Sequence, residues 1–394
     1  MRIVLFSHPA FLPSQSMPRY ANMLAQAYRA RGHDVEVWTA TAQARKWLEG
    51  TRWAKWAGYV DQYLIFPRQV RKKLREQSPD TLYVFCDQAL GPWVPLVRHL
   101  PHVVHAHDLL ALRSALCLIP ENPTPASGRV YQRYIRQGFR QARHFIAVSG
   151  RTRADLQEHA GIPLDHIDVV YNGLNQVFEP VPPEVASPLL TQAGLPDSER
   201  GFLLHVGGSQ WYKNTVGVLK LYHHYLLNQQ ASGGGAPLPL VMVCPPPAGR
   251  IAQALAELPA GADVRFAKGL DSPTLKAVYA TARVFLFPSL AEGFGWPIVE
   301  AQACGTVVLT TDDAPMNEIG GPAACYLRRL TTAESVDAWA RDGAQQLASM
   351  LAWTPEQRQA RVQQGLEWAK RFEADYAIEG YLAVYRKVLD TPII

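Results

Sequence analysis

The chain alternates short apolar runs with amphipathic stretches along its whole length, and this alternation limits the folds open to it. The run 3–6 is long enough for one buried strand, and behind it Tyr20, Met23, Leu24 and Ala27 recur at helical spacing. Such alternation is typical of β-α-β units with parallel strands. The pattern therefore predicts an α/β protein made of doubly wound, Rossmann-like sheets.

The expected strands fall into two groups on either side of a proline-rich stretch. They are 3–6, 35–39, 82–85, 103–105, 144–148 and 168–171, then 202–206, 240–243, 264–267, 284–287 and 307–310. Residues 179–196, with Pro180, Pro182 and Pro183, have the composition of a linker. Because 394 residues exceed what one core usually organises, we expect domains at 1–178 and 179–371.

Composition excludes several classes of protein. Hydrophobic residues make up 48% and charged residues 19%, which is the balance of a globular chain. No apolar run is long enough to span a bilayer, and the one at the N-terminus is too short for a signal peptide, so we expect a cytoplasmic protein. The five cysteines are scattered without a C-x-x-C pair, which favours buried thiols over zinc ligands or disulfides.

The richest candidate for chemistry follows the expected strand 284–287. It contains Glu292, Gly293, Phe294, Gly295 and Glu300. The glycines permit close backbone approach, and a helix that begins near residue 297 presents free N–H groups to an anion such as a diphosphate. The two acids can accept hydrogen bonds from sugar or ribose hydroxyls, or they can simply cap the helix and complement its dipole.

A second candidate follows the strand 202–206. Gly207, Gly208 and Ser209 form a turn, and Lys213 lies at the start of the next helix, where its charge can stabilise a leaving diphosphate. The alternative is a solvated surface lysine. Ser16, at the N-terminus of the first expected helix, is a weaker candidate for binding phosphate.

A third candidate is a histidine pair near residue 105. Strand alternation points His105 and His107 to the same face. No third metal ligand is evident, so we expect His107, at the strand end, to meet the sugar or the acceptor. A merely structural histidine is the alternative.

The segment from Glu292 to Glu300 closely resembles the E-x7-E signature of the retaining glycosyltransferases of family 4, which have the GT-B fold. Segments 300–308, 144–149, 170–173 and 32–35 also match that family's pattern, so the resemblance covers nearly the whole chain. It implies that Glu292 contacts the transferred sugar and that Glu300 contacts the nucleotide ribose. It also implies metal-independent, same-face transfer in a cleft between the domains, without a cofactor.

The same resemblance assigns further roles and exposes two departures. It implies that Phe266 and Gly269 hold the nucleobase, and that the amphipathic stretch Tyr376–Leu389 packs back on the N-terminal domain. The family usually has an arginine at the position of Gly208 and a Gly-Gly pair where this chain has residues 15–17. A catalytic histidine found in some members is replaced here by the sequence Cys-Asp-Gln at 86–88.

Residues 45–76 carry nine Lys or Arg against three Asp or Glu, interleaved with Trp47, Trp53 and Trp56. Cations beside indoles suit an anionic membrane surface or a lipid-linked acceptor. The alternatives are a basic helix face with buried tryptophans, or nucleic-acid binding, for which no accompanying motif is present.

We therefore expect a retaining glycosyltransferase that moves a hexose from a GDP- or UDP-linked donor to a glycan or lipid-linked acceptor, in envelope polysaccharide biosynthesis. The donor would bind the C-terminal domain and the acceptor the N-terminal domain. The alternatives are a catalytically silent membrane-binding module, a nucleotide-sugar epimerase or a phosphorylase. Fold alone does not decide among them.

Overall fold

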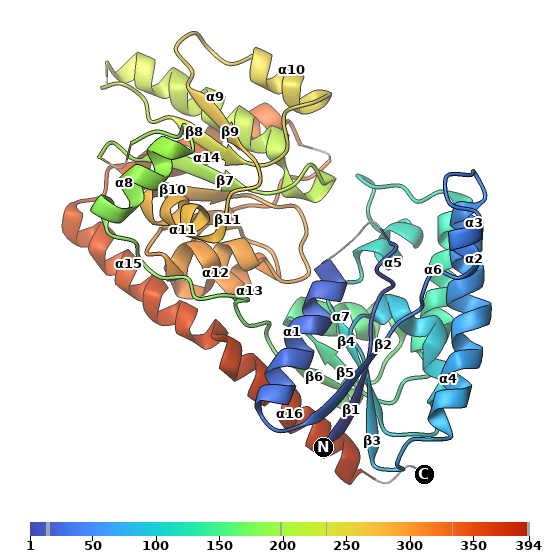
Figure 1. The fold of residues 1–394 in the computed structure, drawn as a ribbon. Helices are drawn as coiled ribbons and strands as arrows, with labels where there is room; N and C mark the ends of the chain where they lie inside the picture. The colour runs from blue at the N-terminus through green and yellow to red at the C-terminus, as the bar shows by residue number, and fades with distance from the viewer. Residues whose placement is uncertain (13–15, 198, 234, 333, 392–394) are drawn as a thin grey trace. The chain divides into compact units, whose positions relative to one another are not determined.

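The computed structural model describes residues 1–12, 16–197, 199–233, 235–332 and 334–391. The chain forms two compact units, each with a parallel sheet of its own (Figure 1). Unit 1 comprises Met1–Asn175 and Ala374–Ile394, and unit 2 comprises Gln176–Glu373. The expected fold class, two Rossmann-like α/β sheets, is confirmed.

The sheet of unit 1 has the strand order β2-β1-β3-β4-β5-β6. Its strands are β1 (Arg2–Phe6), β2 (Asp34–Trp38), β3 (Thr81–Phe85), β4 (His102–Ala106), β5 (Phe145–Ala147) and β6 (Ile167–Val169). All pair in parallel, and each lies within two residues of an expected strand.

Helices cover both faces of this sheet (Figure 1). They are α1 (Ser16–Ala30), α2 (Ala44–Trp47), α3 (Ala54–Val60), η1 (Asp61–Ile65), α4 (Phe66–Leu74), η2 (Gln88–Leu96), α5 (Leu110–Ala115), α6 (Ala126–Phe139), α7 (Gly150–Asp155), η3 (Leu156–Ala160), η4 (Leu164–His166) and α16 (Ala374–Asp390). In β1, Val4 and Phe6 enter one core cluster while Ile3 and Leu5 enter the other. This alternation explains why a strand buried on both faces reads as an unbroken apolar run.

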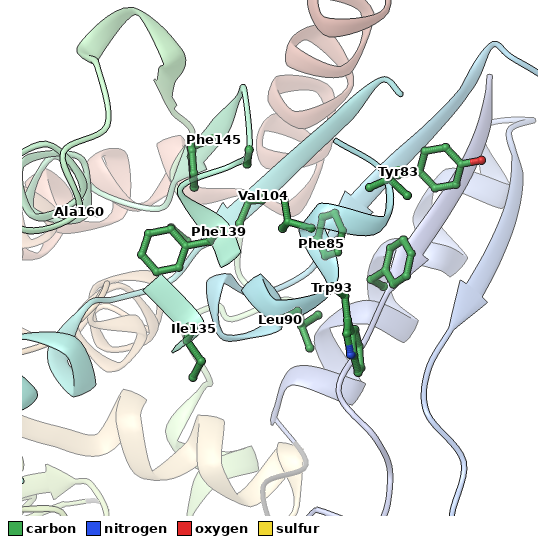
Figure 2. Close-up of a cluster of buried hydrophobic side chains, with 14 of the residues drawn as sticks. Tyr83, Phe85, Leu90, Trp93, Val104, Ile135, Phe139, Phe145 and Ala160 are labelled. Atoms are coloured by element: carbon green, nitrogen blue, oxygen red, sulfur yellow. The ribbon is translucent and has the colours of Figure 1, made fainter. Parts of the chain in front are cut away.

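Aromatic side chains dominate the first of these clusters (Figure 2). Phe85 stacks on Phe6, and Trp93 of η2 packs beside both strands. A glycine pair brings η2 and α6 together. A Cβ on Gly138 would lie 2.2 Å from the carbonyl oxygen of Gly91, so neither position has room for a side chain.

The C-terminal helix α16 is part of unit 1 and packs on its second core cluster. His105 accepts or donates to two tyrosine hydroxyls, with Nδ1 2.9 Å from Tyr20 and Nε2 2.8 Å from Tyr385 of α16. Tyr381 donates to Asn172, which follows β6. These buried hydrogen bonds fix α16 against the sheet.

Unit 2 has the strand order β12-β11-β10-β7-β8-β9. Its strands are β7 (Phe202–Val206), β8 (Leu240–Val243), β9 (Val264–Ala267), β10 (Ala282–Phe287), β11 (Val308–Thr311) and β12 (Cys325–Leu327). Strand β12 was not predicted, because an edge strand of three residues, two of them half-buried, leaves too short a pattern.

The helices of unit 2 include one in the stretch that was expected to be a linker. They are α8 (Pro183–Gln192), η5 (Trp211–Lys213), α9 (Thr215–Ser232), α10 (Arg250–Ala256), α11 (Ser272–Thr281), α12 (Trp296–Ala303), α13 (Met316–Gly320), η6 (Gly321–Ala323), α14 (Val336–Leu351), α15 (Pro355–Ala369) and η7 (Lys370–Phe372).

Helix α8 lies where a linker was expected, and that expectation is wrong. Pro183 occupies the first turn, where no backbone donor is needed, and Ala186 and Leu190 are buried one turn apart. None of the helices in the described ranges is long and apolar enough to span a bilayer.

Candidate functional site

Two loops in unit 2 lie side by side because they follow neighbouring strands, β7 and β10. The backbone N–H of Leu290 donates to the carbonyl of Tyr212 at 2.7 Å, and the Asn214 amide donates to the carbonyl of Pro288 at 3.0 Å. Asn214 has a left-handed backbone, with φ of 52°, which asparagine tolerates better than most residues. The two segments singled out from the sequence therefore form one site.

The loop after β10 is held rigidly through four consecutive backbone carbonyls. Each accepts a hydrogen bond from a different side chain. The pairs are Thr310 with Phe287 (2.8 Å), Asn214 with Pro288 (3.0 Å), Thr311 with Ser289 (2.7 Å) and Arg329 with Leu290 (2.8 Å). These bonds fix the path of the chain into Glu292 and position its carboxylate.

Lys213 and Glu292 form an ion pair at the centre of this site. The Lys213 ammonium lies 2.8 Å from Oε1 of Glu292, and Ser289 donates to the same oxygen at 2.8 Å. Only 14% of the lysine side chain and 10% of the glutamate side chain are exposed. The ammonium also lies 4.8 Å from the ring centroid of Phe287, a cation–π distance. The sequence candidates Lys213 and Glu292 are thus in direct contact.

Helix α12 begins directly after this loop. Gly295 is its N-cap with φ of 102°, which only glycine adopts at little cost, and Pro297 lies in the first turn. Gly293 lies in the loop that leads into this helix. The Phe294 side chain, in the same loop, is buried against Phe372. The Phe294 ring is therefore enclosed within unit 2, and a role of this residue in donor binding stays a prediction.

Glu300 lies one turn inside α12, in surroundings unlike those of Glu292. Its Oε2 accepts a hydrogen bond from the Tyr279 hydroxyl at 2.7 Å. Burial raises the pKa of Glu300, while the hydrogen bond from Tyr279 and the charge of Lys213 oppose the rise. The two acids therefore differ: one is paired with a cation, and the other is held by a neutral donor.

In the turn after β7, the space beside a glycine is occupied by a glutamine side chain. A Cβ on Gly208 would lie 2.0 Å from the side-chain oxygen of Gln210, so Gln210 occupies the space beside the glycine. Beneath Gly207, the buried His205 has Nδ1 2.9 Å from the carbonyl of Leu286, and its Nε2 has no partner among the described residues. Burial lowers the pKa of His205 to about 4.

Three other predicted site residues belong to other elements of the chain. Phe266 of β9 packs against the main apolar cluster of unit 2, and Gly269 follows it with φ of +68°. Ser16 is the exposed first residue of α1 in unit 1, and Gln15 lies outside the described residues. Roles in binding the base or a phosphate stay predictions for all three.

His107 follows β4 in unit 1. Its Nε2 lies 2.9 Å from the carbonyl of Cys86, so this nitrogen carries the hydrogen and Nδ1 keeps a lone pair. Burial lowers the pKa of His107, which favours the neutral ring. Tyr20 packs edge-on against it and also bonds to His105, so both histidines lie on the face that strand alternation predicted. Within the described ranges, no cluster of three or more His, Cys, Asp or Glu side chains is placed to hold a metal ion.

Known proteins match both units. Residues 17–176 match the family described as Glycosyltransferase Family 4, and residues 190–349 match the family described as Glycosyl transferases group 1. The chain is a family 4 glycosyltransferase. This membership confirms the family that the sequence resembles, and the residue roles implied by the E-x7-E signature stay predictions.

Individual relatives of this family 4 transferase are distant. A D-inositol 3-phosphate glycosyltransferase of Segniliparus rotundus is 28% identical over 74% of this chain and 62% of its own length. The O-antigen chain mannosyltransferase B of Escherichia coli is 24% identical over 66% of this chain and 64% of its own. The matches thus span less than two thirds of either relative.

Structural comparison adds the fold. Anabaena HepE in complex with UDP is similar with a TM-score of 0.68 and 17% identity, over 98% of this chain and 100% of that one. At this identity the likeness shows the GT-B fold of the family 4 transferase and nothing finer.

The sequence reading found the charged residues of the site and missed those that hold them. The loop is held by Ser289, Asn214, Thr310, Thr311 and Arg329. Thr310 and Thr311 end β11, Ser289 and Arg329 follow β10 and β12 by two residues, and Asn214 follows η5, so nearness to a strand end was the only signal for the first four. Polar residues at the carboxyl ends of adjacent parallel strands deserve the same scrutiny as the acids themselves.

Proposed function

We propose that this family 4 transferase moves a hexose from a nucleotide-diphosphate sugar bound by unit 2 to a glycan or lipid-linked acceptor bound by unit 1, with retention of anomeric configuration. The observation that carries the proposal is the ion pair between Lys213 and Glu292, held at the ends of two adjacent strands and beside the N-terminus of α12. A cation beside the positive end of a helix dipole suits a diphosphate.

Each group of the site has a chemical task in this proposal. Lys213 stabilises the negative charge that grows on the diphosphate as the glycosidic bond breaks. Glu292 then accepts hydrogen bonds from sugar hydroxyls, and Glu300 accepts them from the ribose. Gly295 caps the start of α12, where the positive end of the helix dipole favours an anion. Leaving-group stabilisation by fixed groups needs no reorganisation during the reaction.

The diphosphate side lacks the arginine usual at the position of Gly208. A bidentate guanidinium contact is therefore missing. Lys213, Ser209 and the backbone N–H of Gly208 carry that task instead, which predicts weaker nucleotide binding than an arginine-bearing relative would have.

The acceptor and the pathway follow from chemistry and from relatives. His107, neutral and with Nδ1 as an acceptor, suits a hydroxyl of the acceptor. The Escherichia coli relative is named as an O-antigen chain mannosyltransferase, which supports a role in envelope polysaccharide synthesis and transfer of mannose. The HepE structure contains UDP, which supports a UDP-linked donor.

The test is a panel of nucleotide-sugars. GDP-mannose, UDP-glucose, ADP-glucose and dTDP-glucose are each incubated with the protein, and the released nucleoside diphosphate is measured. Thermal shifts with GDP, UDP, ADP and dTDP identify the base, because a ligand that binds only the folded state raises stability with occupancy. NMR of the product's anomeric proton decides between retention and inversion. Absence of turnover and of nucleotide binding across the panel would refute the proposal.

A second proposal concerns the surface formed by α2 and α3. Trp47, Trp53 and Trp56 are 90%, 52% and 61% exposed, so the alternative of buried tryptophans is wrong. They lie among Arg45, Lys46, Arg52 and Lys55. Exposed indoles among cations suit an anionic lipid surface, where the rings reach headgroup depth. We propose that this surface brings the enzyme to a lipid-linked acceptor.

Vesicle co-sedimentation tests the membrane proposal. The protein should bind vesicles of phosphatidylcholine with 30% phosphatidylglycerol more tightly than pure phosphatidylcholine, and the double variant W47A/W56A should lose that binding. Tyr376 on α16 is 67% exposed and provides the matched control Y376A, which should bind as the parent does. Binding that is indifferent to anionic lipid would contradict the proposal. Lipid binding without turnover on any donor would favour a silent module.

A further inference from the structure

The carboxyl edge of the unit 1 sheet holds a charged pair that the proposed donor chemistry does not use. Asp87 follows β3, and its Oδ2 lies 2.9 Å from Nε2 of His8, in the loop after β1. Strands β1 and β3 are neighbours, which brings these two loops together. The side chains are 13% and 18% exposed, so the pair is mostly enclosed yet still reaches water.

The carboxylate is fixed and remains ionised. Its Oδ1 accepts the backbone N–H of Ala89 at 2.9 Å, which starts η2. Burial acts to raise the pKa of Asp87, but the hydrogen bond and the charge of His8, together with the Ala89 N–H, outweigh it and lower the pKa. Gln88 joins this loop to the end of β4 by accepting from the His107 N–H at 3.1 Å and donating to the Asp108 carbonyl at 2.6 Å.

A cluster of tyrosines includes a residue of α6, the helix on which η2 packs. The ring centroids of Tyr59 and Tyr131 are 5.9 Å apart, and the hydroxyls of Tyr63 and Tyr131 lie 2.7 Å apart, so α3, η1 and α6 contribute to one cluster. Asp87 caps η2, and η2 packs closely on α6, the helix that carries Tyr131. Burial raises the pKa of Tyr131, and the negative charge of Asp87 contributes to the rise. An acceptor-rich anion next to aromatic faces suits a sugar ring, whose hydroxyls donate and whose C–H faces are apolar.

We propose that Asp87, positioned by His8, binds a neutral hydroxyl of the sugar acceptor, with His107 and the tyrosine cluster completing the subsite. This inference rests on the proposed transfer function and deepens it. It also specifies the acceptor: the group that meets Asp87 is a hydroxyl and not a phosphate, because an ionised carboxylate repels an anion. Asp87 has a structural task as well, the cap of η2, and the test below separates the two.

The first experiment needs neither donor nor turnover. Full-length protein labelled with ¹³C at histidine Cε1 is titrated with methyl α-mannoside, methyl α-glucoside, methyl α-galactoside and methyl α-N-acetylglucosaminide. The variants H8Q and H107Q assign the two signals. We expect the signals of His8 and His107 to move with saturation, while that of His205, which is buried in unit 2, stays fixed. No movement with any of the four glycosides, or movement that persists in D87N, would overturn the proposal.

The second experiment measures function. D87N keeps an oxygen for the cap but removes the charge, and loss of a hydrogen bond to a charged group weakens binding about 10- to 100-fold. Stimulation of nucleoside diphosphate release by the glycoside should fall by that factor in kcat/KM. Variant H8Q, whose amide still donates to Asp87, should retain more of the stimulation than H8A. Equal loss in H8Q and H8A, or unaltered stimulation in D87N, would contradict the assignment.

A third measurement keeps the two proposals distinguishable. The thermal shift produced by the nucleoside diphosphate reports on unit 2 and on folding, so D87N and H8A should show the shift of the parent. If the protein binds no nucleotide while the glycosides still move the His8 and His107 signals, the transfer proposal fails and the sugar subsite stands. If the nucleotide binds and the glycosides do nothing, the reverse holds.

Discussion

Replacing Lys213 by methionine tests the centre of the donor site. Methionine keeps an unbranched side chain of similar length but removes the ammonium that lies 2.8 Å from Glu292 and 4.8 Å from the centroid of Phe287. If Lys213 stabilises the departing diphosphate, kcat should fall about 10²- to 10³-fold, the usual effect of deleting one group that stabilises a transition-state charge.

The same variant should also destabilise unit 2, because Glu292 is left mostly buried without its cation. Breaking a fully buried pair costs about 3–5 kcal/mol. Here 14% and 10% of the two side chains reach water and Ser289 still donates to the carboxylate, so we expect about 2 kcal/mol. For a unit of this size that is about 4–8 °C in Tm. Variant K213M/E292Q should recover part of the loss, since it leaves no unpaired charge.

Nucleoside diphosphate release and thermal melting read these effects separately. Lys220 supplies the matched control: it pairs with Glu257 at the same 2.8 Å, at 22% exposure, on α9. K220M should leave kcat unchanged. A K213M enzyme within threefold of the parent's kcat would refute leaving-group stabilisation. If the loss of stability in K213M/E292Q equals the sum of the losses in K213M and E292Q, the ion pair is refuted. Residues in contact couple by 0.5–3 kcal/mol, on the order of the expected effect.

Three further predictions test the acid, the core and the pH response. E300Q should weaken nucleotide binding about tenfold by loss of a charge-assisted hydrogen bond. Because burial raises the pKa of Glu300, E300Q should also gain stability over the parent as pH rises through that pKa, and match it near pH 4 or below, in urea melts. G138A should lose about 3 kcal/mol or more by overpacking against the backbone of Gly91, whereas G235A, in open space, should melt as the parent does. Since the pKa of His205 is lowered to about 4, its protonation opposes folding, and stability should fall by about 3 kcal/mol from pH 6.5 to 4; H205Q should flatten that slope in urea melts.

The strands were predictable because a strand buried on both faces leaves an uninterrupted apolar run. Ile3–Phe6 illustrates this, since alternate residues enter different core clusters. Strand β12 was not predictable by the same reasoning, because Cys325 and Tyr326 lie at a sheet edge and are only half-buried. Helix α8 was missed for the opposite reason: its prolines suggested a linker, although Pro183 falls where a helix tolerates proline.

The residue types of the donor site were predictable from the sequence, but the contacts between these residues were not. Sequence spacing alone left Glu292 and Glu300 as either ligands or helix caps, and left Lys213 as either a phosphate ligand or a surface charge. What the sequence could not contain is that residues 79 positions apart meet at 2.8 Å. That contact depends on the sheet order β10-β7, a crossover that no local pattern specifies.

Both sheets have, at their carboxyl edge, a carboxylate paired with a basic side chain from the loop of a neighbouring strand. This shared arrangement explains where sequence reasoning fails. In unit 2 a carboxylate after β10 is paired with a cation after β7, and in unit 1 a carboxylate after β3 is paired with an imidazole after β1. In each case the partner strands are adjacent in the sheet but not along the chain. In the sequence, Asp87 was noted only because residues 86–88 replace a histidine found in some family members. Nothing in the sequence indicated that His8 is its partner. A buried carboxylate is costly without a partner, so every such acid at the end of a parallel strand directs the search to the loops of the two neighbouring strands.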